Sequence, residues 1–505
     1  MFDYVVVGAG SAGCVLAARL SEDPATDVLL LEAGPRDRKL EIRIPAAFSK
    51  LYGSGVDWAY RTVPQENLDG REIYVPLGKT LGGSSSINAQ MVLRGHAADQ
   101  EAWQAPGWGW PEAEQAYARS SGSFVREPLR DPSPLTHAFV AAAEALGIPP
   151  SADLNAPDNS GVGLVPVSQR RGRRWSVADG YLRPALRRPN LTVATGARAA
   201  RILLDRGRAA GVAYRLDGRE AEAPARRDVI VSCGTINSPQ LLLLSGIGPR
   251  EAIEGVGLEL VHELPGVGRN LRDHLANGIF CRTHDAVTLF TAESWRNLVR
   301  WLVRRRGPLC SNVGEAGAFV RTRPELAAPD LELLFAPVLF VDEGLSPPPE
   351  DGVTIAAVAL QPGSVGEVSL RSADPNDPPL VDPRYLSDPG DADVLVQGVR
   401  LARRIAAQEP LARHISEELA PGSAAESDED ILAHVRALSQ TLYHPVGTCR
   451  LGTDDAAVVD PLLRVRGVEG LRVVDASVMP RSPRGHTNWP TVMIAERAVE
   501  LIRGT

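Results

Sequence analysis

The stretch Tyr4-Val5-Val6-Val7-Gly8-Ala9-Gly10-Ser11-Ala12-Gly13 decides the fold of this 505-residue chain. It begins with a short apolar run rich in valine, which is typical of a buried parallel strand. Three glycines follow in the pattern Gly-x-Gly-x-x-Gly, and helix-forming residues come next. We predict that Gly8 permits a tight turn, that Gly10 lets the backbone approach a diphosphate, and that Gly13 allows close packing of helix on strand.

A second apolar run, residues 28–31, ends at Glu32, about 20 residues beyond Gly13. Strand, glycine turn, helix and strand together predict a βαβ unit. The helix N-terminus would offer amide groups and a positive dipole to the diphosphate. The Glu32 carboxylate would accept ribose hydroxyls and repel a 2′-phosphate. This pattern predicts a dinucleotide site but does not separate FAD from NAD.

Composition narrows the class of protein. A chain of 505 residues suits two or three structural domains. Its 44% hydrophobic content and net charge of −8 exclude global disorder. The acidic balance also makes a nucleic-acid partner unexpected. For the cluster Arg170, Arg171, Arg173 and Arg174 we expect a solvated surface turn rather than a basic patch.

Cysteine usage and the N-terminus bear on cofactors and location. The five cysteines are widely spaced and form no Cys-x-x-Cys pair, so we expect no metal and a reducing compartment. The chain starts directly in a strand without a basic leader, and no run of about 20 apolar residues follows. We therefore expect a cytoplasmic protein with no transmembrane segment. Peripheral contact with a membrane stays open.

The rest of the sequence predicts two kinds of structure, an irregular and strand-rich middle and an α/β tail. Residues 36–100 are irregular and predict a long insertion wrapped over a cofactor, and strand-like runs at 331–335, 354–360 and 367–370 alternate with Pro-rich loops. Helical periodicity appears at 391–407 and 427–438. The tail returns to α/β character, with a strand at 471–474 and a helix from Pro490 to Ile502. This order predicts a discontinuous cofactor domain.

Three further segments accompany the N-terminal motif: GKTLGGSSSIN at 78–88, GTINSPQLLLLSGIG at 234–248, and YHPVGTC at 443–449, the last followed by VDASVMP at 474–480 and TNWPT at 487–491. Together they resemble the glucose–methanol–choline (GMC) oxidoreductase family from residue 2 to about 503. The middle of the chain, with GPL at 307–309 and EAG at 315–317, is similar to its choline dehydrogenase-like and alcohol dehydrogenase-like branch.

The resemblance implies FAD rather than NAD. It also implies a fold of the α/β class (α+β overall), with a Rossmann-like FAD-binding domain and a substrate domain of antiparallel sheet plus helices. We assign residues 1–155, 187–275 and 440–505 to the FAD-binding domain. Residues 156–186 and 276–439 are assigned to the substrate-binding domain.

The resemblance also carries cofactor contacts onto this chain, with Ala199 at the position that touches adenine through the backbone. The expected cofactor-binding residues are Gly8, Gly10, Ser11, Ala12, Gly13, Glu32, Ala33, Gly82, Ser85, Asn88, Met91, Ala199, Asp475, Ala476, Pro490 and Thr491. Ile87 stands where choline oxidase-like members carry a histidine bonded covalently to the flavin. Isoleucine cannot form that bond, so we expect non-covalent FAD.

Oxidising an alcohol with a flavin requires a base for the hydroxyl proton, and histidine suits this near neutral pH. His444 matches the catalytic base of the family, and Asn488 matches its partner, which can hydrogen-bond the substrate oxygen without titrating. Asn488 is also placed to cap the helix that Pro490 begins. We further expect the N-terminus of that helix to face the flavin and stabilise negative charge there.

Four more residues are candidates for the substrate pocket. Tyr443 precedes the base, and His486 is a second polar contact or a structural neighbour. Trp489 stands where small residues are usual, so we expect it to narrow the pocket or pack on the flavin. Glu315 is a candidate counter-ion for a cationic substrate, although the same acid occurs in branches that do not use choline.

We therefore expect an FAD-dependent dehydrogenase or oxidase that converts a primary alcohol to an aldehyde. Its partners would be the alcohol and an electron acceptor (oxygen, a quinone or a redox protein), with the chain as a monomer or homodimer. A hydroxynitrile lyase-like or photodecarboxylase-like lyase on the same scaffold is the alternative. A third possibility, a catalytically silent flavoprotein, is disfavoured by the intact base.

Overall fold

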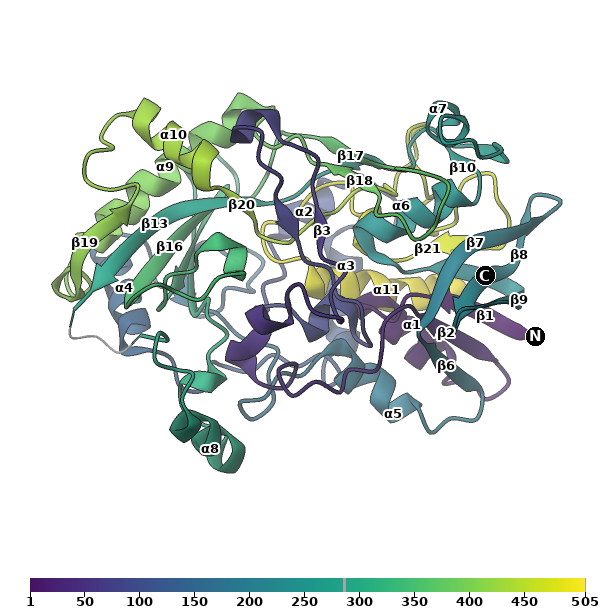
Figure 1. Cartoon of the computed structure of the whole chain (residues 1–505), viewed down its shortest axis with the longest axis horizontal. Coiled ribbons are helices and arrows are strands. Elements are labelled where there is room, and N and C mark those ends of the chain that lie inside the picture. Colours follow the sequence, from purple (N-terminus) through teal and green to yellow (C-terminus); the bar gives the residue numbers. More distant parts are fainter. Residues whose placement is uncertain (285–287, 505) are drawn as a thin grey trace.

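The computed structural model describes residues 1–284 and 288–504 and contains two large sheets at opposite ends of the molecule (Figure 1). Helix α11 (Asn488–Arg503) starts near the middle of the molecule and runs toward the first sheet, and both chain termini lie at that end (Figure 1). Within the described residues, no helix is long and apolar enough to cross a membrane.

The first sheet is parallel at its centre, in the order β6-β2-β1-β9 with β21 paired to β9. Strands β1, β2 and β21 and the end of β9 at residues 229–231 are buried on both faces, as central parallel strands require. The edge strand β6 is half-buried beyond Leu191. An antiparallel extension through β8 and β7 continues from β9. The strands are β1 (Phe2–Val7), β2 (Val28–Glu32), β6 (Leu191–Thr195), β7 (Ala197–Asp205), β8 (Arg208–Leu216), β9 (Arg219–Val231) and β21 (Leu471–Val473).

Helices cover this sheet and close the predicted βαβ unit. Helix α1 connects β1 to β2 and packs on α11, which in turn packs on α3. The predicted Rossmann-like order of strand, glycine turn, helix and strand is confirmed. The helices on this side are α1 (Ser11–Leu20), α2 (Ala97–Glu101), α3 (Trp110–Ser120), α5 (Arg183–Ala185), α6 (Gly234–Leu244), α7 (Arg250–Glu254) and η4 (Ala178–Leu182).

The second sheet is antiparallel, in the order β19-β13-β16-β15-β14-β5 with β20 paired to β13. Helix α9 lies across it, and Gly398 of α9 comes so close to β16 that a Cβ there would sit 2.5 Å from the Cβ of Ala357. The elements are β5 (Gly161–Leu164), β13 (Leu275–Thr283), β14 (Ala316–Val320), β15 (Leu331–Ala336), β16 (Gly352–Ala359), β19 (Ile415–Ala420), β20 (Gln440–Thr441), α4 (Pro134–Ala145), α9 (Pro389–Ala406) and α10 (Asp428–Leu438).

Two parts of the chain differ from the simplest expectation. The strand expected at 367–370 does not join the second sheet, because β17 (Gly366–Ser369) pairs with β12 (Arg269–Leu271) and β18 (Leu380–Asp382) instead. Helix α4, from the stretch assigned to the FAD-binding domain, packs on β5, β14 and α9 of the second sheet. The remaining short pairs are β3 (Tyr60–Arg61) with β4 (Tyr74–Val75), and β10 (Ile247–Gly248) with β11 (His262–Glu263).

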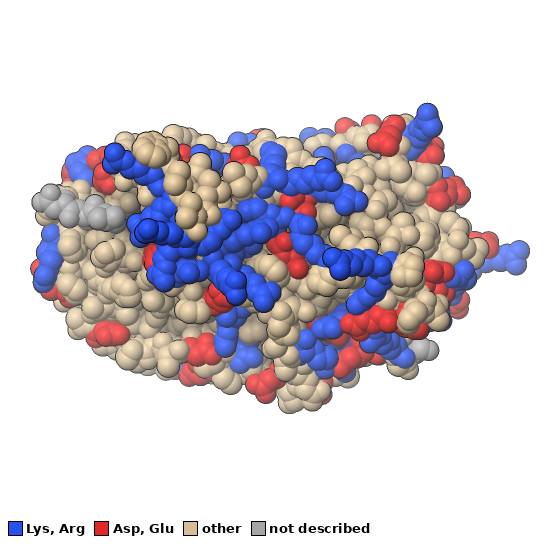
Figure 2. All heavy atoms as spheres, turned by 90° about the horizontal axis from the view of Figure 1, so that it is seen from below, with Lys and Arg blue, Asp and Glu red and all other residues tan. Residues whose placement is uncertain are grey.

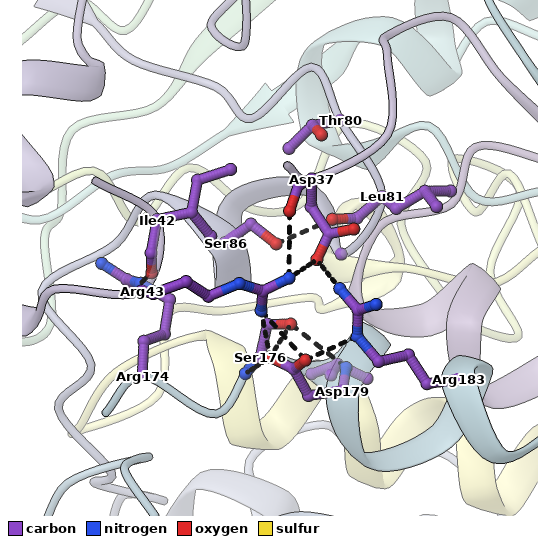
Figure 3. A network of polar contacts seen from close by, with 12 residues as sticks. Asp37, Ile42, Arg43, Thr80, Leu81, Ser86, Arg174, Ser176, Asp179 and Arg183 are labelled. Atoms are coloured by element: carbon purple, nitrogen blue, oxygen red, sulfur yellow. Dashed lines mark hydrogen bonds and ion pairs between the residues drawn. The ribbon is translucent and has the colours of Figure 1, made fainter. Parts of the chain in front are cut away.

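A buried ionic network fastens the irregular insertion to the first half of the molecule (Figure 3). Arg43 donates to both oxygens of Asp179, at 2.9 and 2.8 Å, and to Asp37 at 2.7 Å. Arg183 also bridges Asp37 and Asp179. Burial opposes ionisation of Asp179, but Arg43 and Arg183 outweigh it and lower the pKa of this carboxyl. The network thereby anchors the segment that precedes the pocket-lining residues of the insertion.

We expect Asp179→Asn to destabilise the fold by about 3 kcal/mol, because it leaves two guanidinium groups without their shared carboxylate. The midpoint of urea unfolding measures the loss. The matched control is Glu254→Gln, which breaks the exposed pair with Arg250 and should leave the urea midpoint almost unchanged, because solvent screens exposed ion pairs. Equal shifts in the two variants would contradict the prediction.

The same contact has a defined pH dependence. Because the pKa of Asp179 is lowered by folding, its stabilisation is present above the unfolded value near ~3.9 and is lost as pH falls through the lower folded value. The stability difference between wild type and Asp179→Asn should therefore shrink as the solution is acidified.

Candidate active site

One pocket receives residues from both sheets and from the insertion. It extends from the N-terminal glycine motif to the segment that carries His444. The residues predicted to bind cofactor that line it are Gly8, Gly10, Ser11, Ala12, Glu32, Ala33, Asn88, Met91, Ala199, Asp475, Ala476 and Thr491. The other four, Gly13, Gly82, Ser85 and Pro490, lie outside the lining.

The glycine motif leaves room for a diphosphate. Gly10 precedes α1 without a side-chain cap, and a Cβ there would meet nothing closer than the Ser232 carbonyl oxygen at 3.9 Å. At Gly13, by contrast, a Cβ would lie 1.8 Å from the Gly8 oxygen, which is the close helix–strand packing expected of the third glycine. The first amides of α1 therefore meet an open space at Gly10, which fits the diphosphate of FAD.

The two acids of the pocket are fixed by backbone amides. Glu32 accepts from the amides of Ala9 at 2.9 Å and Gly34 at 2.7 Å. Burial raises the pKa of Glu32 to about 7, against these two hydrogen bonds. Asp475 accepts from the Gly234 amide at 2.9 Å, and burial raises its pKa as well. Both carboxyls are held rigidly at the pocket wall. Glu32 keeps one lone pair on each oxygen that a ribose hydroxyl can reach, whereas both oxygens of Asp475 are filled by Gly234, Ser238 and Ser477.

The expectation of a solvated arginine turn at 170–174 is wrong for Arg174. This residue is fully buried, and its guanidinium donates to Asn88 Oδ1 at 2.7 Å and to the carbonyls of Ser85 and Ile42. Burial lowers its pKa to about 9. Asn88 Oδ1 also accepts from the Gln90 amide, so the oxygen is occupied and the amide nitrogen is left as the donor on the pocket side.

His444 lies at the other end of the pocket and belongs to a histidine pair that sequence reasoning missed. Its Nδ1 is 3.0 Å from Nδ1 of His274, which is buried and does not line the pocket. Nε2 of His274 lies 3.0 Å from the Leu360 carbonyl oxygen. The Nδ1 edge of His444 thus faces the protein interior, and its Nε2 edge faces the pocket.

The hydrogen bonds of this pair fix its tautomers. Burial lowers the pKa of His274 to about 3, so this ring is neutral. A carbonyl oxygen only accepts, so the single proton of His274 is on Nε2 and its Nδ1 is an acceptor. His444 must then donate from Nδ1, which leaves the lone pair of Nε2 directed at the pocket. Burial, together with His486 and His274, lowers the pKa of His444 well below its ordinary value. The His444 ring is therefore unprotonated and can accept a proton.

Asp273 holds the backbone of the same segment. It accepts from the His444 amide at 2.9 Å, from the Tyr385 hydroxyl at 2.6 Å and from the Thr441 hydroxyl. Burial raises the pKa of Asp273 to about 6, so the carboxylate is mostly ionised at neutral pH. Asp273 and His274 directly precede β13, and no local sequence pattern marked either of them, because their partners come from a segment about 170 residues away.

A third histidine, His486, packs on His444. The rings of His444 and His486 are 4.5 Å apart, and Nε2 of His486 lies 3.3 Å from the carboxylate of Glu332. Glu332 is fully buried in β15, and its other oxygen has no hydrogen-bond partner among the described residues. His486 is therefore a pocket-lining group backed by a buried carboxylate, and nothing in the local sequence identified Glu332.

Asn488 lines the pocket at the first residue of α11, so it does not cap that helix as expected. Its Oδ1 accepts from the Ser11 hydroxyl at 2.6 Å, which joins the starts of α1 and α11. With the oxygen occupied, its amide nitrogen is the free donor, since no described residue accepts from it.

Two of the four predicted pocket residues lie elsewhere. Trp489 does not line the pocket: it stacks on Phe124 at 5.6 Å and donates to Ser120, since its side chain leaves α11 toward α3. Glu315 is buried and accepts from the amide of Ser133, where α4 begins, at 2.7 Å; it is outside the lining too. His486 and Tyr443 do line it.

An aromatic wall continues from Tyr443 along the pocket. Tyr443 contacts Tyr52 at 5.7 Å, Tyr52 contacts Phe48 at 5.8 Å, and Phe48 stacks on Phe340 at 6.3 Å. All four rings line the pocket. Across the described residues, no group of three or more His, Cys, Asp or Glu side chains has the arrangement of a metal site.

A parallel sheet with a glycine turn that leaves room for a diphosphate, joined to an antiparallel sheet that brings a buried histidine to the same pocket, is the arrangement expected of a flavin-type oxidoreductase. Family models of the GMC oxidoreductases match residues 2–276 and 362–495, so the chain belongs to the GMC oxidoreductase family. As a member, it is an oxidoreductase that uses FAD.

Similar proteins span nearly the whole chain. A GMC-type oxidoreductase of Mycobacterium tuberculosis without a characterised activity is 49% identical, covering 99% of both chains. Alcohol dehydrogenase (acceptor) of Pseudomonas putida is 42% identical, covering 99% of this chain and 96% of its own. Human mitochondrial choline dehydrogenase is also 42% identical, over 100% of this chain and 90% of its own.

Solved structures agree with the fold. Pyridoxine 4-oxidase from Mesorbium loti superposes with a TM-score of 0.92 at 31% identity, covering 100% of both chains. A formate oxidase superposes with a TM-score of 0.93 at 26% identity, covering 100% of this chain and 98% of its own.

We expect FAD to be bound without a covalent link, because the pocket presents Ile87 where an attachment residue would be needed. Precipitating the holoprotein with acid should leave the yellow flavin in the supernatant, as absorbance shows. Flavin that stays with the washed pellet would contradict this.

Proposed function

We propose that this chain oxidises a primary alcohol to an aldehyde, with His444 as the base and Asn488 as a donor to the substrate oxygen. The observation that carries the proposal is the His274–His444 hydrogen bond, which leaves a lone pair on Nε2 of His444 facing the pocket. The family membership supports it, since named relatives include an alcohol dehydrogenase and a choline dehydrogenase.

The chain's own groups perform the proton part of the reaction. The hydroxyl proton passes to Nε2 of His444, and the Nδ1–H bond to His274 keeps the ring in the orientation that receives it. Asn488 donates from its amide nitrogen to the oxygen as negative charge grows there. A bound FAD would supply the hydride acceptor, so that one alcohol would give one aldehyde, one proton and one hydride.

The pocket favours an uncharged, apolar alcohol. Of the described residues that line it, the acids are Glu32 and Asp475, both occupied with backbone amides of the dinucleotide half. The pocket wall beside His444 is aromatic, and Glu315 does not line the pocket. A cationic substrate such as choline would lack a carboxylate partner here, whereas an aliphatic or aromatic alcohol would bury its chain favourably.

An electron acceptor must regenerate the oxidised cofactor, and we infer oxygen, a quinone or a redox protein in this role. A cytoplasmic location is supported by the five unpaired cysteines, four of which are buried. The division into FAD-binding and substrate-binding domains is supported by the two sheets, and the chain would act as a monomer or homodimer.

We expect His444→Ala to slow anaerobic flavin reduction by at least about a hundredfold, because it removes the general base. Stopped-flow bleaching near ~450 nm with aliphatic primary alcohols and choline measures it. His137→Ala, at an exposed position outside the pocket, is the control and should react normally. If dithionite reduces the flavin but no alcohol does, the lyase alternative takes precedence.

His274→Phe should slow the same step by roughly ten- to a hundredfold, because the Nδ1–H of His444 loses its acceptor and the tautomer is no longer fixed. His274→Asn restores an acceptor oxygen near the Nδ1 position, so it should recover most of the rate. The loss should fall on the reduction rate and not on substrate affinity. Equal rates for the Phe and Asn variants would show that His274 has only a packing role.

A further inference from the structure

Helix α8 (Trp295–Arg304) projects from one face of the molecule, away from both sheets (Figure 1). It is attached through one side only: Trp301 is buried beside Leu309, Cys310 and Ala47, and its indole donates to the Gly172 carbonyl at 2.8 Å. The other sides of the helix face solvent.

The solvent side carries an apolar stripe. Trp295, Val299, Leu302 and Val303 follow the spacing i, i+4, i+7, i+8, so they share one face of the helix. Their exposures are 72%, 48%, 47% and 76%. Soluble surfaces seldom expose so many large apolar groups together, and such patches mark interaction sites.

Arginines border this stripe. Arg296, Arg300 and Arg304 follow the spacing i, i+4, i+8 on the adjoining face, and no carboxylate of the described residues lies within salt-bridge distance of any of them. Arg306 extends the row, although it pairs with Asp131. Their long stems can lie along the apolar stripe while the guanidinium groups reach outward.

A neighbouring loop adds to the charge. Gly172 lies against the Arg305 carbonyl, which brings the exposed Arg170 and Arg171 beside the end of α8. Figure 2, seen from the side on which α8 projects, shows Lys and Arg side chains gathered on this face. A chain with net charge −8 therefore carries a strongly basic face centred on one helix. We call the exposed residues of α8 and Arg170 and Arg171 the α8 face.

We propose that the α8 face docks on a bilayer surface that contains anionic lipids. A bilayer offers a partner for both features of the α8 face: an apolar interior for the stripe and, just above it, a layer of negative phosphate groups for the arginines. A second copy of the chain would bring like charge against like charge, and a nucleic acid would leave the apolar stripe in water. Trp295 at the start of the helix suits the interface between lipid chains and headgroups.

The position of α8 gives docking a consequence for the pocket. Trp301 packs on Ala47 of η1 (Pro45–Leu51), and the same short helix carries Phe48, a member of the aromatic wall. The docked helix would thus hold the aromatic side of the pocket close to the lipid surface, where apolar alcohols and quinones partition.

Sedimentation of the holoenzyme with vesicles tests the proposal. We expect binding to vesicles of phosphatidylcholine mixed with phosphatidylglycerol, weaker binding at high salt, and little to phosphatidylcholine alone. Arg300→Gln with Arg304→Gln should lower the partition coefficient by about fivefold per arginine. Trp295→Ser with Val303→Ser should lower it by roughly tenfold or more.

Matched controls lie on other faces. Arg206→Gln with Arg219→Gln removes two exposed charges from the β7–β9 hairpins, and Val261→Ser removes an apolar side chain that is 56% exposed. These should bind vesicles like the wild type, and all variants should keep their flavin and its reduction by alcohol. No preference for anionic vesicles, or equal binding by the α8 and control variants, would overturn the proposal. So would a sedimentation-velocity shift from dimer to monomer confined to the α8 variants, since it would make a second copy the occupant.

Discussion

The pairing of β13 with β20 is the constraint on which the chemistry of the pocket depends. Leu275 opposes Thr441 in this short antiparallel ladder, and the Leu442 amide donates to the His274 carbonyl at 2.8 Å. The residues just before β13 and just after β20 are thereby forced together, although about 170 residues separate them in sequence. His274 and His444 come into contact because the paired strands place them side by side. Asp273 holds this arrangement by accepting a hydrogen bond from the His444 amide.

A neutral histidine as the acceptor for His444 has a different effect from a carboxylate. It fixes the tautomer but adds no negative charge, and burial keeps both rings neutral at rest. A proton that passes from the alcohol to His444 therefore leaves the net charge of the pocket unchanged but separates it into an imidazolium and an alkoxide. Loss of the hydride from the alkoxide carbon would discharge the substrate as the aldehyde forms, so proton transfer is favourable only when hydride transfer accompanies it. The arrangement links proton loss from the alcohol to its oxidation.

The sequence predicted the parts of the fold that local patterns encode. The βαβ unit follows from the valine run, the glycine spacing and Glu32, and family motifs located His444 and Asn488. Contacts made across long sequence distances were not predictable this way: His274 and Glu332 have no local signature, because their partners come from other elements. Trp489 and Arg174 were assigned to the wrong surroundings for a related reason, since a side chain's direction depends on packing that one segment does not reveal.

The insertion at 36–100 connects the pocket to the α8 face. Its η1 presents Phe48 to the pocket and Ala47 to α8, so one short helix forms both the aromatic wall and the seat of the exposed helix. A displacement of α8 reaches the pocket through a single layer of η1 side chains, because close-packed side chains transmit displacement. The ionic network of Asp37, Arg43 and Asp179 holds the preceding segment still, so a displacement of η1 would be confined to the aromatic side of the pocket. The glycine motif follows β1, and the two histidines lie next to the paired strands β13 and β20, so both groups would keep their geometry. Surface docking could therefore adjust access to the substrate side without disturbing the reacting groups.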